Sequence, residues 1–329
     1  MTTTAASGAG AVAAALSAAG RVLIVSHRDP DGDAIGSSIG LSLALDALGI
    51  ANDVLLGSGT VCPVTYAWLP GSDRCAAADA LAASCAGWDV VAVLDSPDLS
   101  RLDAAETLAR SGGRIVLIDH HPGDAADAAV SWVDATAPAV GVLIWDLLPL
   151  LGVAADTAIA TCLYTALVTD TGRFSYANAT PRAFRAAAGM VEAGADANEV
   201  YLAIYETRSP GAQALLTRTL ARLRLENDGL VAYSWISEQD FDETGALRAE
   251  AENLIDAVRP LAGIEVALLA KCGAGTVRMS LRAKSDFDVS AVARAFGGGG
   301  HRAAAGFTYA GELTALLADL LPMLPGGRL

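Results

Sequence analysis

The stretch from Ser26 to Ser38 constrains the fold of this chain more than any other part of the sequence. It follows an apolar run at residues 22–25 and precedes residues 35–48, whose apolar side chains recur at helical spacing. It carries one imidazole and three carboxylates: His27, Asp29, Asp31 and Asp33. Carboxylates crowded at the end of a strand repel one another unless a cation lies among them. Asp-Pro-Asp-Gly is also ordinary turn chemistry, so this stretch alone leaves a purely structural turn open.

Composition sets broad limits on the fold and the ligands. The 329 residues are 53% hydrophobic and 18% charged, which is enough to bury the core of one large or two ordinary domains. The net charge of −15 argues against binding a long duplex, which needs a broad basic surface. The charge still permits a short nucleotide substrate and leaves acidic groups for divalent metals.

The cysteines and the N-terminus indicate a cytoplasmic protein. The five cysteines form no C-x-x-C pair, so a disulfide framework or a structural zinc site is not expected. Residues 1–20 lack the positively charged start of a signal peptide. No run approaches the roughly 20 strongly apolar residues that span a bilayer. We therefore expect no membrane partner.

Short apolar runs alternate with helical patterns in the first half of the chain. The predicted strands are 22–26, 53–56, 89–94 and 114–118, with an edge strand at 131–133. The predicted helices are 10–19, 37–48, 76–86, 104–111, 140–151 and 156–169. This alternation, with strands apolar on both faces, predicts an α/β fold with a doubly wound parallel sheet.

The second half of the chain changes character. Residues 180–226 look wholly helical. After them come predicted strands at 230–235, 266–271 and 276–281 and a helix at 254–258. We expect a first domain at residues 1–190, a helical linker at 191–215, and a smaller α/β domain with a mixed sheet at 216–329.

Metal-type ligands follow the predicted strands where those strands end. His27 follows the first strand, Asp95 the third, and Asp119-His120-His121 the fourth, while Asp170 follows the helix 156–169. The carboxyl ends of parallel strands meet at one edge of a sheet, where ligands bind. Imidazole and carboxylate without thiolate suit Mn²⁺ or Mg²⁺. Two ions sharing one carboxylate is the arrangement used for displacement at phosphorus, so we predict metal-assisted phosphoester hydrolysis.

The C-terminal half carries a different signal, Gly297-Gly298-Gly299-Gly300-His301-Arg302. Consecutive glycines are tolerated where backbone approaches a ligand closely, although a flexible surface loop is the alternative. Between Lys271 and Arg302, six Lys or Arg stand against two Asp, a local charge of +4. This half would therefore hold the phosphate end of the substrate.

These motifs resemble those of the DHH phosphoesterase superfamily. The residues that match are His27-x-x-x-Asp31-x-Asp33, Asp95, Asp119-His120-His121 and Thr169-Asp170-Thr171-Gly172, with Gly297–His301 resembling the glycine-rich motif of the DHH-associated domain. The resemblance implies that His27 and Asp31 bind one Mn²⁺. It also implies that Asp33, His120 and Asp170 bind a second ion, with Asp95 bridging. Mg²⁺ or Co²⁺ are possible substitutes.

The resemblance also implies roles around the metals. Asp119 would orient its neighbouring imidazole, and His121 would face the substrate or the attacking water and could donate a proton. The implied phosphate contacts are Arg282 and His301 with Gly298, Gly299 and Gly300, while Arg278 and Asn253 are placed by position alone. A homodimer is also implied.

In length and domain content the chain looks most like NrnA-type oligoribonucleases that also dephosphorylate 3′-phosphoadenosine 5′-phosphate. Hydrolysis of cyclic di-AMP or its linear product pApA is associated with related proteins, and the sequence does not rank these substrates. Two alternatives stay open. They are a RecJ-like single-strand exonuclease, which would be longer, and a catalytically inactive nucleotide-binding sensor.

Overall fold

The chain forms two compact units that meet between Glu206 and Thr207, within the range predicted as a linker. The computed structural model describes residues 6–57, 59, 61–83, 87–122, 127–251 and 254–327. Within these residues, no helix is long and apolar enough to cross a membrane.

The first unit is built on a six-stranded parallel sheet with strand order β1-β6-β5-β4-β2-β3. Its strands are β1 (Ala6–Ser7), β2 (Arg21–Val25), β3 (Ala51–Leu55), β4 (Val90–Leu94), β5 (Arg114–Asp119) and β6 (Val130–Val133). Its α-helices are α1 (Ala9–Ser17), α2 (Gly32–Ala47), α3 (Ala78–Ala83), α4 (Glu106–Ser111), α5 (Val140–Leu151), α6 (Thr157–Asp170), α7 (Pro181–Glu192) and α8 (Ala197–Tyr205). Short 3₁₀ turns occur at Val64–Tyr66, Ser72–Arg74 and Leu99–Ala105.

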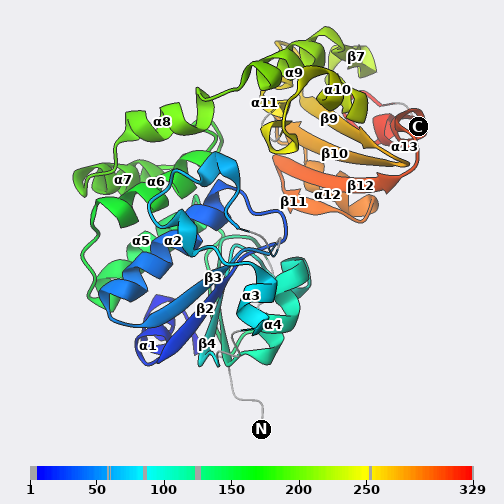
Figure 1. Cartoon of the computed structure of the whole chain (residues 1–329). Helices are drawn as coiled ribbons and strands as arrows, with labels where there is room; N and C mark the ends of the chain where they lie inside the picture. The colour runs from blue at the N-terminus through cyan, green and yellow to red at the C-terminus, as the bar shows by residue number, and fades with distance from the viewer. Residues whose placement is uncertain are drawn as a thin grey trace. The chain divides into compact units, whose positions relative to one another are not determined.

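Successive side chains of the central strands point to opposite faces of this sheet, and each face has its own core. On β2, Val22 and Ile24 pack in the core that α1, α2, α5 and α6 share, whereas Leu23 and Val25 pack in the core with α3 and α4. Figure 1 shows α3 and α4 on the opposite side of the strands from α2 and α5. The predicted doubly wound parallel sheet is therefore confirmed.

Glycines allow α2 and α6 to pack unusually close together. A Cβ atom added at Gly36 would lie 2.4 Å from the carbonyl oxygen of Cys162, and one added at Gly32 would lie 2.4 Å from the Thr169 hydroxyl. Only glycine fits at this spacing. The contact of Gly32 with Thr169 brings the first turn of α2 beside the last turn of α6.

The second unit is a six-stranded mixed sheet with order β11-β12-β10-β9-β8-β7, in which β8 and β9 are parallel and the other pairs antiparallel. Its strands are β7 (Arg224–Glu226), β8 (Val231–Ser237), β9 (Val266–Gly273), β10 (Thr276–Ala283), β11 (Gly299–His301) and β12 (Ala304–Ala310). Its α-helices are α9 (Pro210–Ala221), α10 (Glu238–Thr244), α11 (Ile255–Val258), α12 (Val289–Ala295) and α13 (Leu313–Leu320). Short 3₁₀ turns lie at Asn227–Gly229, Arg248–Ala251 and Leu321–Met323. The predicted mixed sheet is confirmed.

Several predicted boundaries were wrong in detail. Helix α2 begins at Gly32, five residues before the predicted start at 37, because the Asp31 side chain caps it by accepting from the amides of Asp33 and Ala34. Strand β6 is not an edge strand, because β1 pairs outside it. Residues 224–226 form a strand rather than helix, since their amides and carbonyls pair with β8. The last three residues of the predicted helix 76–86 lie outside the described residues.

Candidate active site

Three neighbouring strands deliver the predicted ligands to one edge of the first sheet. The strands β2, β4 and β5 are adjacent and parallel, so their carboxyl ends meet. His27 follows β2, Asp95 follows β4 directly, and Asp119 ends β5 ahead of His120 and His121. The start of α2 adds Asp31 and Asp33, and the end of α6 adds Asp170.

The structure gathers these residues into two clusters that share Asp95. One cluster is His27, Asp31 and Asp95, and the other is Asp33, Asp95 and His120; the ligand atoms in each lie within 4.8 Å of one another. Nε2 of His27 lies 3.3 Å from Oδ2 of Asp95, and Nε2 of His120 lies 3.6 Å from Oδ1. The two oxygens of this carboxylate therefore face different clusters.

The spacing and chemistry of these groups fit divalent cations. Ligands about 2.1 Å from an octahedral ion lie about 3 Å apart, and N–H···O hydrogen bonds span about 2.7–3.2 Å. The distances from His120 Nε2 to Asp33 Oδ2 and to Asp170 Oδ2 are 3.8 and 4.0 Å, which leaves these atoms too far apart to bond one another well. Oδ1 of Asp95 is buried and accepts no hydrogen bond from the described residues. A buried carboxylate oxygen without a hydrogen bond calls for a cation, and the imidazoles of His121 and His120 approach this one only to 3.3 and 3.6 Å.

The pKa shifts of the clustered residues indicate that the buried carboxylates favour nearby positive charge. Burial raises the pKa of Asp170 to about 7, with the charges of Asp31 and Asp95 adding to the effect against the opposing charge of His120. Burial also raises the pKa of Asp33 well above its usual range, and the Asp95 charge adds to this. Burial alone lowers the pKa of His120, but the nearby Asp95 carboxylate and the charges of Asp170 and Asp33 raise it to about 11. These raised pKa values favour protonation at the places where cations fit, so protons and cations would compete there.

The backbone at Asp95 is left-handed, with a φ of 56°. Few residues other than glycine adopt this conformation, although aspartate tolerates it better than most. Such a conformation persists where the surrounding structure fixes it, and it recurs at functional sites. Here the Asp95 amide donates to the carbonyl of Ile118 on β5 at 3.2 Å, which holds the turn after β4 against the neighbouring strand.

Asp33 is held by the first turn of α5. The amides of Val140 and Gly141 donate to its two carboxylate oxygens at 2.7 and 2.9 Å, and the Ser37 hydroxyl donates at 2.9 Å. A helix N-terminus favours a carboxylate because its amides are unpaired and its dipole is positive there. The sequence analysis did not identify this helix end, because the contact joins residues 107 positions apart. It also missed Ser37, which lies one helical turn after Asp33.

Asp119 and His121 form a hydrogen-bonded pair. Oδ1 of Asp119 lies 2.8 Å from Nδ1 of His121 and accepts from the amides of His120 and His121 at 2.7 and 3.0 Å. These two residues and Asp95 also lie within ligand distance of one another. The 2.8 Å contact is an ordinary hydrogen bond, so it fits an imidazole oriented by a carboxylate better than a third ion site. Burial lowers the pKa of His121, but its bond to Asp119 and the nearby Asp95 carboxylate raise it to about 10.

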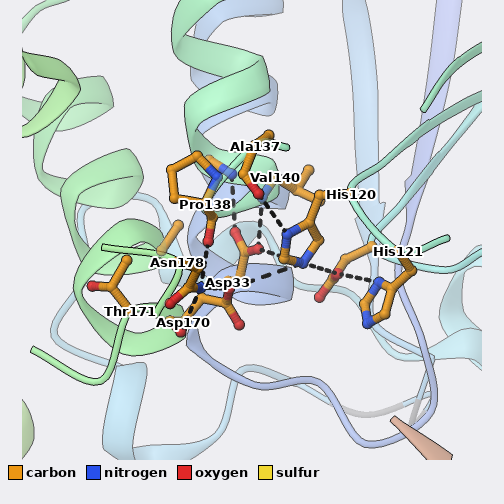
Figure 2. A network of polar contacts seen from close by, with 12 residues as sticks. Asp33, His120, His121, Ala137, Pro138, Val140, Asp170, Thr171 and Asn178 are labelled. Carbon is orange, nitrogen blue, oxygen red and sulfur yellow. Dashed lines mark hydrogen bonds and ion pairs between the residues drawn. The ribbon is translucent and has the colours of Figure 1, made fainter. Parts of the chain in front are cut away.

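Asp170 has a partner that the sequence analysis missed. Nδ2 of Asn178 donates to Oδ2 of Asp170 at 3.0 Å and to the carbonyl of Pro138 at 3.0 Å. Figure 2 shows Asn178 between Asp170 and Pro138, with Asp33 and His120 alongside. No local pattern marks this asparagine, because Pro138 lies 40 residues away and the contact with Asp170 depends on the path of the loop after α6.

The second unit carries the residues predicted to bind phosphate. Arg278 and Arg282 lie on one face of β10, since they are four residues apart in a strand. Nη1 of Arg282 donates to its neighbour's carbonyl at 3.1 Å, and its buried Nε has no hydrogen-bond partner among the described residues. Asn253 lies outside the described residues.

The glycine run is an ordered β-hairpin rather than a flexible loop. Gly299–His301 forms β11 and pairs with β12. A Cβ atom at Gly298 would lie 2.2 Å from the carbonyl oxygen of Gly306, and Gly300 has a φ of +134°. Close strand packing therefore explains these two glycines, while Gly299 faces open space. Arg302 donates to the carbonyl of Asp286 at 2.9 Å, a contact that stabilises the loop before α12.

Comparison with known proteins agrees with this geometry. Residues 21–167 match the DHH family, N-terminal domain, and residues 227–321 match the DHHA1 domain. A bifunctional oligoribonuclease and PAP phosphatase NrnA from Thermus thermophilus is 31% identical over 89% of this chain and 85% of its own length. The protein of the same name from Bacillus subtilis is 27% identical over 70% of this chain and 74% of its length.

The fold is shared with a solved structure. The crystal structure of an exopolyphosphatase-related protein from Bacteroides fragilis covers 92% of this chain and 91% of its own, with a TM-score of 0.83 and 24% identity. Together, the sheet, its buried clusters of acids and histidines, and the matched domains define a metal-dependent, hydrolytic phosphoesterase. The chain belongs to the DHH family and carries the DHHA1 domain in its second unit.

Proposed function

We propose that this protein is a Mn²⁺-dependent phosphoesterase that degrades short oligoribonucleotides to mononucleotides and dephosphorylates 3′-phosphoadenosine 5′-phosphate. The observation that carries the proposal is the pair of clusters that meet at Asp95, one oxygen facing each. The two NrnA relatives are named for both activities, which supports this substrate class. Hydrolysis of cyclic di-AMP or of pApA is a further candidate activity of the same site.

The proposed ligands follow from the clusters. His27 and Asp31 would hold one ion, Asp33, His120 and Asp170 would hold the other, and Asp95 would serve both. When bound, a pair of divalent cations neutralises charge that develops on the phosphoryl group and lowers the pKa of water. The protein fixes the carboxylates before substrate binds, since Asp31 caps α2 and Asp33 accepts three hydrogen bonds.

His121 is the proposed proton donor to the leaving 3′ oxygen. Asp119 holds Nδ1 of the ring, so Nε2 is the nitrogen turned away from this pair. The raised pKa of His121, about 10, favours a ring that carries a proton at neutral pH. Arg282, with His301 and Gly299, is proposed to bind a phosphate of the substrate, and Arg278 is a further candidate because it shares a strand face with Arg282.

The test is a comparison of kcat/KM across a panel of substrates with Mn²⁺ present. The panel contains RNAs of two to five residues, pApA, 3′-phosphoadenosine 5′-phosphate and cyclic di-AMP. The proposal predicts release of mononucleotide or phosphate from at least the short RNAs or 3′-phosphoadenosine 5′-phosphate. Tight binding of these compounds without any turnover would instead identify a nucleotide-binding sensor.

A RecJ-like exonuclease is separated from this proposal by substrate length. The proposed function predicts that kcat/KM falls as the RNA is extended beyond about five residues, whereas a processive exonuclease gains affinity from a longer single strand. The cysteine usage supports a cytoplasmic location. The family resemblance supports a homodimer, which sedimentation velocity tests.

A further inference from the structure

A five-residue segment ahead of and within the first turn of α5 contacts two ligands of one cluster. The carbonyl of Ala137 lies 3.2 Å from Nδ1 of His120. The amides of Val140 and Gly141 donate to Asp33. The conformation of residues 137–141 therefore sets the direction of both side chains. Figure 2 shows Ala137 and Val140 beside His120 and Asp33.

Asn178 connects this segment to a third ligand of the same cluster. Its Nδ2 donates to the carbonyl of Pro138 at 3.0 Å, and also to Oδ2 and the carbonyl oxygen of Asp170 at 3.0 and 3.1 Å. One amide group thus holds the Asp170 carboxylate and the segment that directs Asp33 and His120. None of the hydrogen bonds that Asn178 makes within the described chain reaches His27 or Asp31.

The conformation of the loop between Asp170 and Asn178 places the asparagine against Asp170 and Pro138. Gly172, Arg173 and Phe174 are all left-handed, with φ of 54°, 60° and 58°. The Thr171 hydroxyl accepts from the Phe174 amide, and the Thr171 carbonyl accepts from the Tyr176 amide at 3.0 Å. A Cβ atom at Gly172 would lie 2.4 Å from the Tyr176 ring, so the turn is closely packed. Two consecutive non-glycine residues adopt the left-handed conformation only where the surrounding contacts hold them there.

We propose that Asn178 is a positioning residue that controls the affinity of the ion site formed by Asp33, His120 and Asp170, and leaves the His27–Asp31 site unaffected. This inference rests on the two-cation centre proposed above. Groups that orient metal ligands through a hydrogen bond typically change metal affinity about 10- to 100-fold when they are removed. Asn178 contacts only one of the two clusters. Its removal should therefore lower the affinity of the ion site at Asp33, His120 and Asp170 only.

The experiment is a calorimetric titration of metal-free protein with Mn²⁺, in the wild type and in Asn178→Ala and Asn178→Ser. Both variants remove the amide group, and serine tolerates loop positions if alanine folds poorly. The control is Ser175→Ala in the same loop, because the Ser175 hydroxyl donates to the Gly172 carbonyl and to no cluster residue. The thermal midpoint of each metal-free protein records any general loss of stability.

The expected result is two Mn²⁺ sites in the wild type and in Ser175→Ala. In the Asn178 variants one site weakens by about 10- to 100-fold and the other stays within about twofold. Equal weakening of both sites, or two unchanged sites, would overturn the inference while leaving the two-cation centre intact. A wild type that binds no Mn²⁺ would instead refute the proposed centre itself.

Discussion

Nδ1 of His121 lies 2.8 Å from Oδ1 of Asp119, and that oxygen also accepts from the backbone amides of both histidines. The carboxylate thus fixes the ring through the side chain and the backbone at once. This arrangement favours a charged imidazole whose Nε2 carries a transferable proton. The proposed acid can therefore be tested by changing the leaving group of the substrate.

Replacing His121 should have an effect that depends on the leaving group. We expect His121→Gln to lower kcat on short RNA by about 10²- to 10⁴-fold, the usual contribution of a proton donor. A nucleoside p-nitrophenyl phosphate releases a stable anion that needs no proton, so its hydrolysis should fall far less. Equal losses on both substrates, measured side by side, would exclude His121 as the donor.

The close packing of α2 and α6 makes a prediction about stability. Gly36→Ala places a methyl group where the Cys162 carbonyl lies 2.4 Å away, so we expect about 1–3 kcal/mol of destabilisation in chemical denaturation. The matched control is Gly10→Ala in α1, where nothing lies within 4 Å. That change should be neutral or stabilise by about 0.5–1 kcal/mol, because alanine favours helix. Similar values for both variants would show that the helices do not pack as described.

Asp240 makes the stability of the second unit depend on pH. Its buried carboxylate accepts from Nη1 and Nη2 of Arg222 at 2.5 and 2.7 Å, and from the Ser237 amide at 2.8 Å. Burial raises its pKa, but these bonds prevail and hold the pKa below its usual value of 3.8. The stabilisation that the charged Asp240 provides is therefore fully present above pH 3.8 and is lost as the pH falls below that value.

The test compares the thermal unfolding of the wild type and Asp240→Asn between pH 7 and pH 2.5. At pH 7 the variant should be less stable by about 3 kcal/mol, the scale for removing one partner of a buried ion pair. The difference in stability between the wild type and Asp240→Asn should become smaller as the pH falls. Glu243→Gln is the control, since Glu243 is exposed and its pair with Arg218 should contribute little. A stability difference that does not change with pH would show that the charge of Asp240 does not stabilise the second unit.

Arg282 should act on substrate binding. We expect Arg282→Ala to raise KM by about tenfold or more with a smaller change in kcat, because a charge-assisted bond to phosphate is worth about 1.5–3 kcal/mol. Arg294→Ala removes an equal charge from the same unit, but Arg294 bonds to Ser290 on its own helix. Its KM should match that of the wild type. An unchanged KM in Arg282→Ala would remove it from the phosphate site.

Much of the fold and of the ligand set can be predicted from the sequence because both are local patterns. Apolar runs mark β2, β4 and β5, and the ligands stand directly after them, where a parallel sheet gathers them. The resemblance of the motifs then suggests how the ligands divide between two ions. Of the boundaries, the start of α2 was missed because its first turn is polar and glycine-rich, without apolar periodicity.

The supporting groups could not be predicted, because they depend on contacts between distant segments. Asn178 and the first turn of α5 act on Asp170 and Asp33 only after α2, α5 and α6 pack together. The spacing of Gly32, Gly36 and Gly40 was a usable signal for this packing, since small residues every four positions let helices approach. The glycine run at 297–300 had a partly structural cause that only the pairing of β11 with β12 reveals.

The proposed function requires that Asp95 serve two cation sites during phosphoester hydrolysis. The most direct test measures release of mononucleotide from a three-residue RNA as metal-free protein is titrated with Mn²⁺. We expect no release in excess chelator, activity that grows as two equivalents bind, and a loss of at least about 10³-fold in Asp95→Asn with Mn²⁺ restored. Turnover that persists in chelator, or an Asp95→Asn variant with a near-normal rate, would contradict the account.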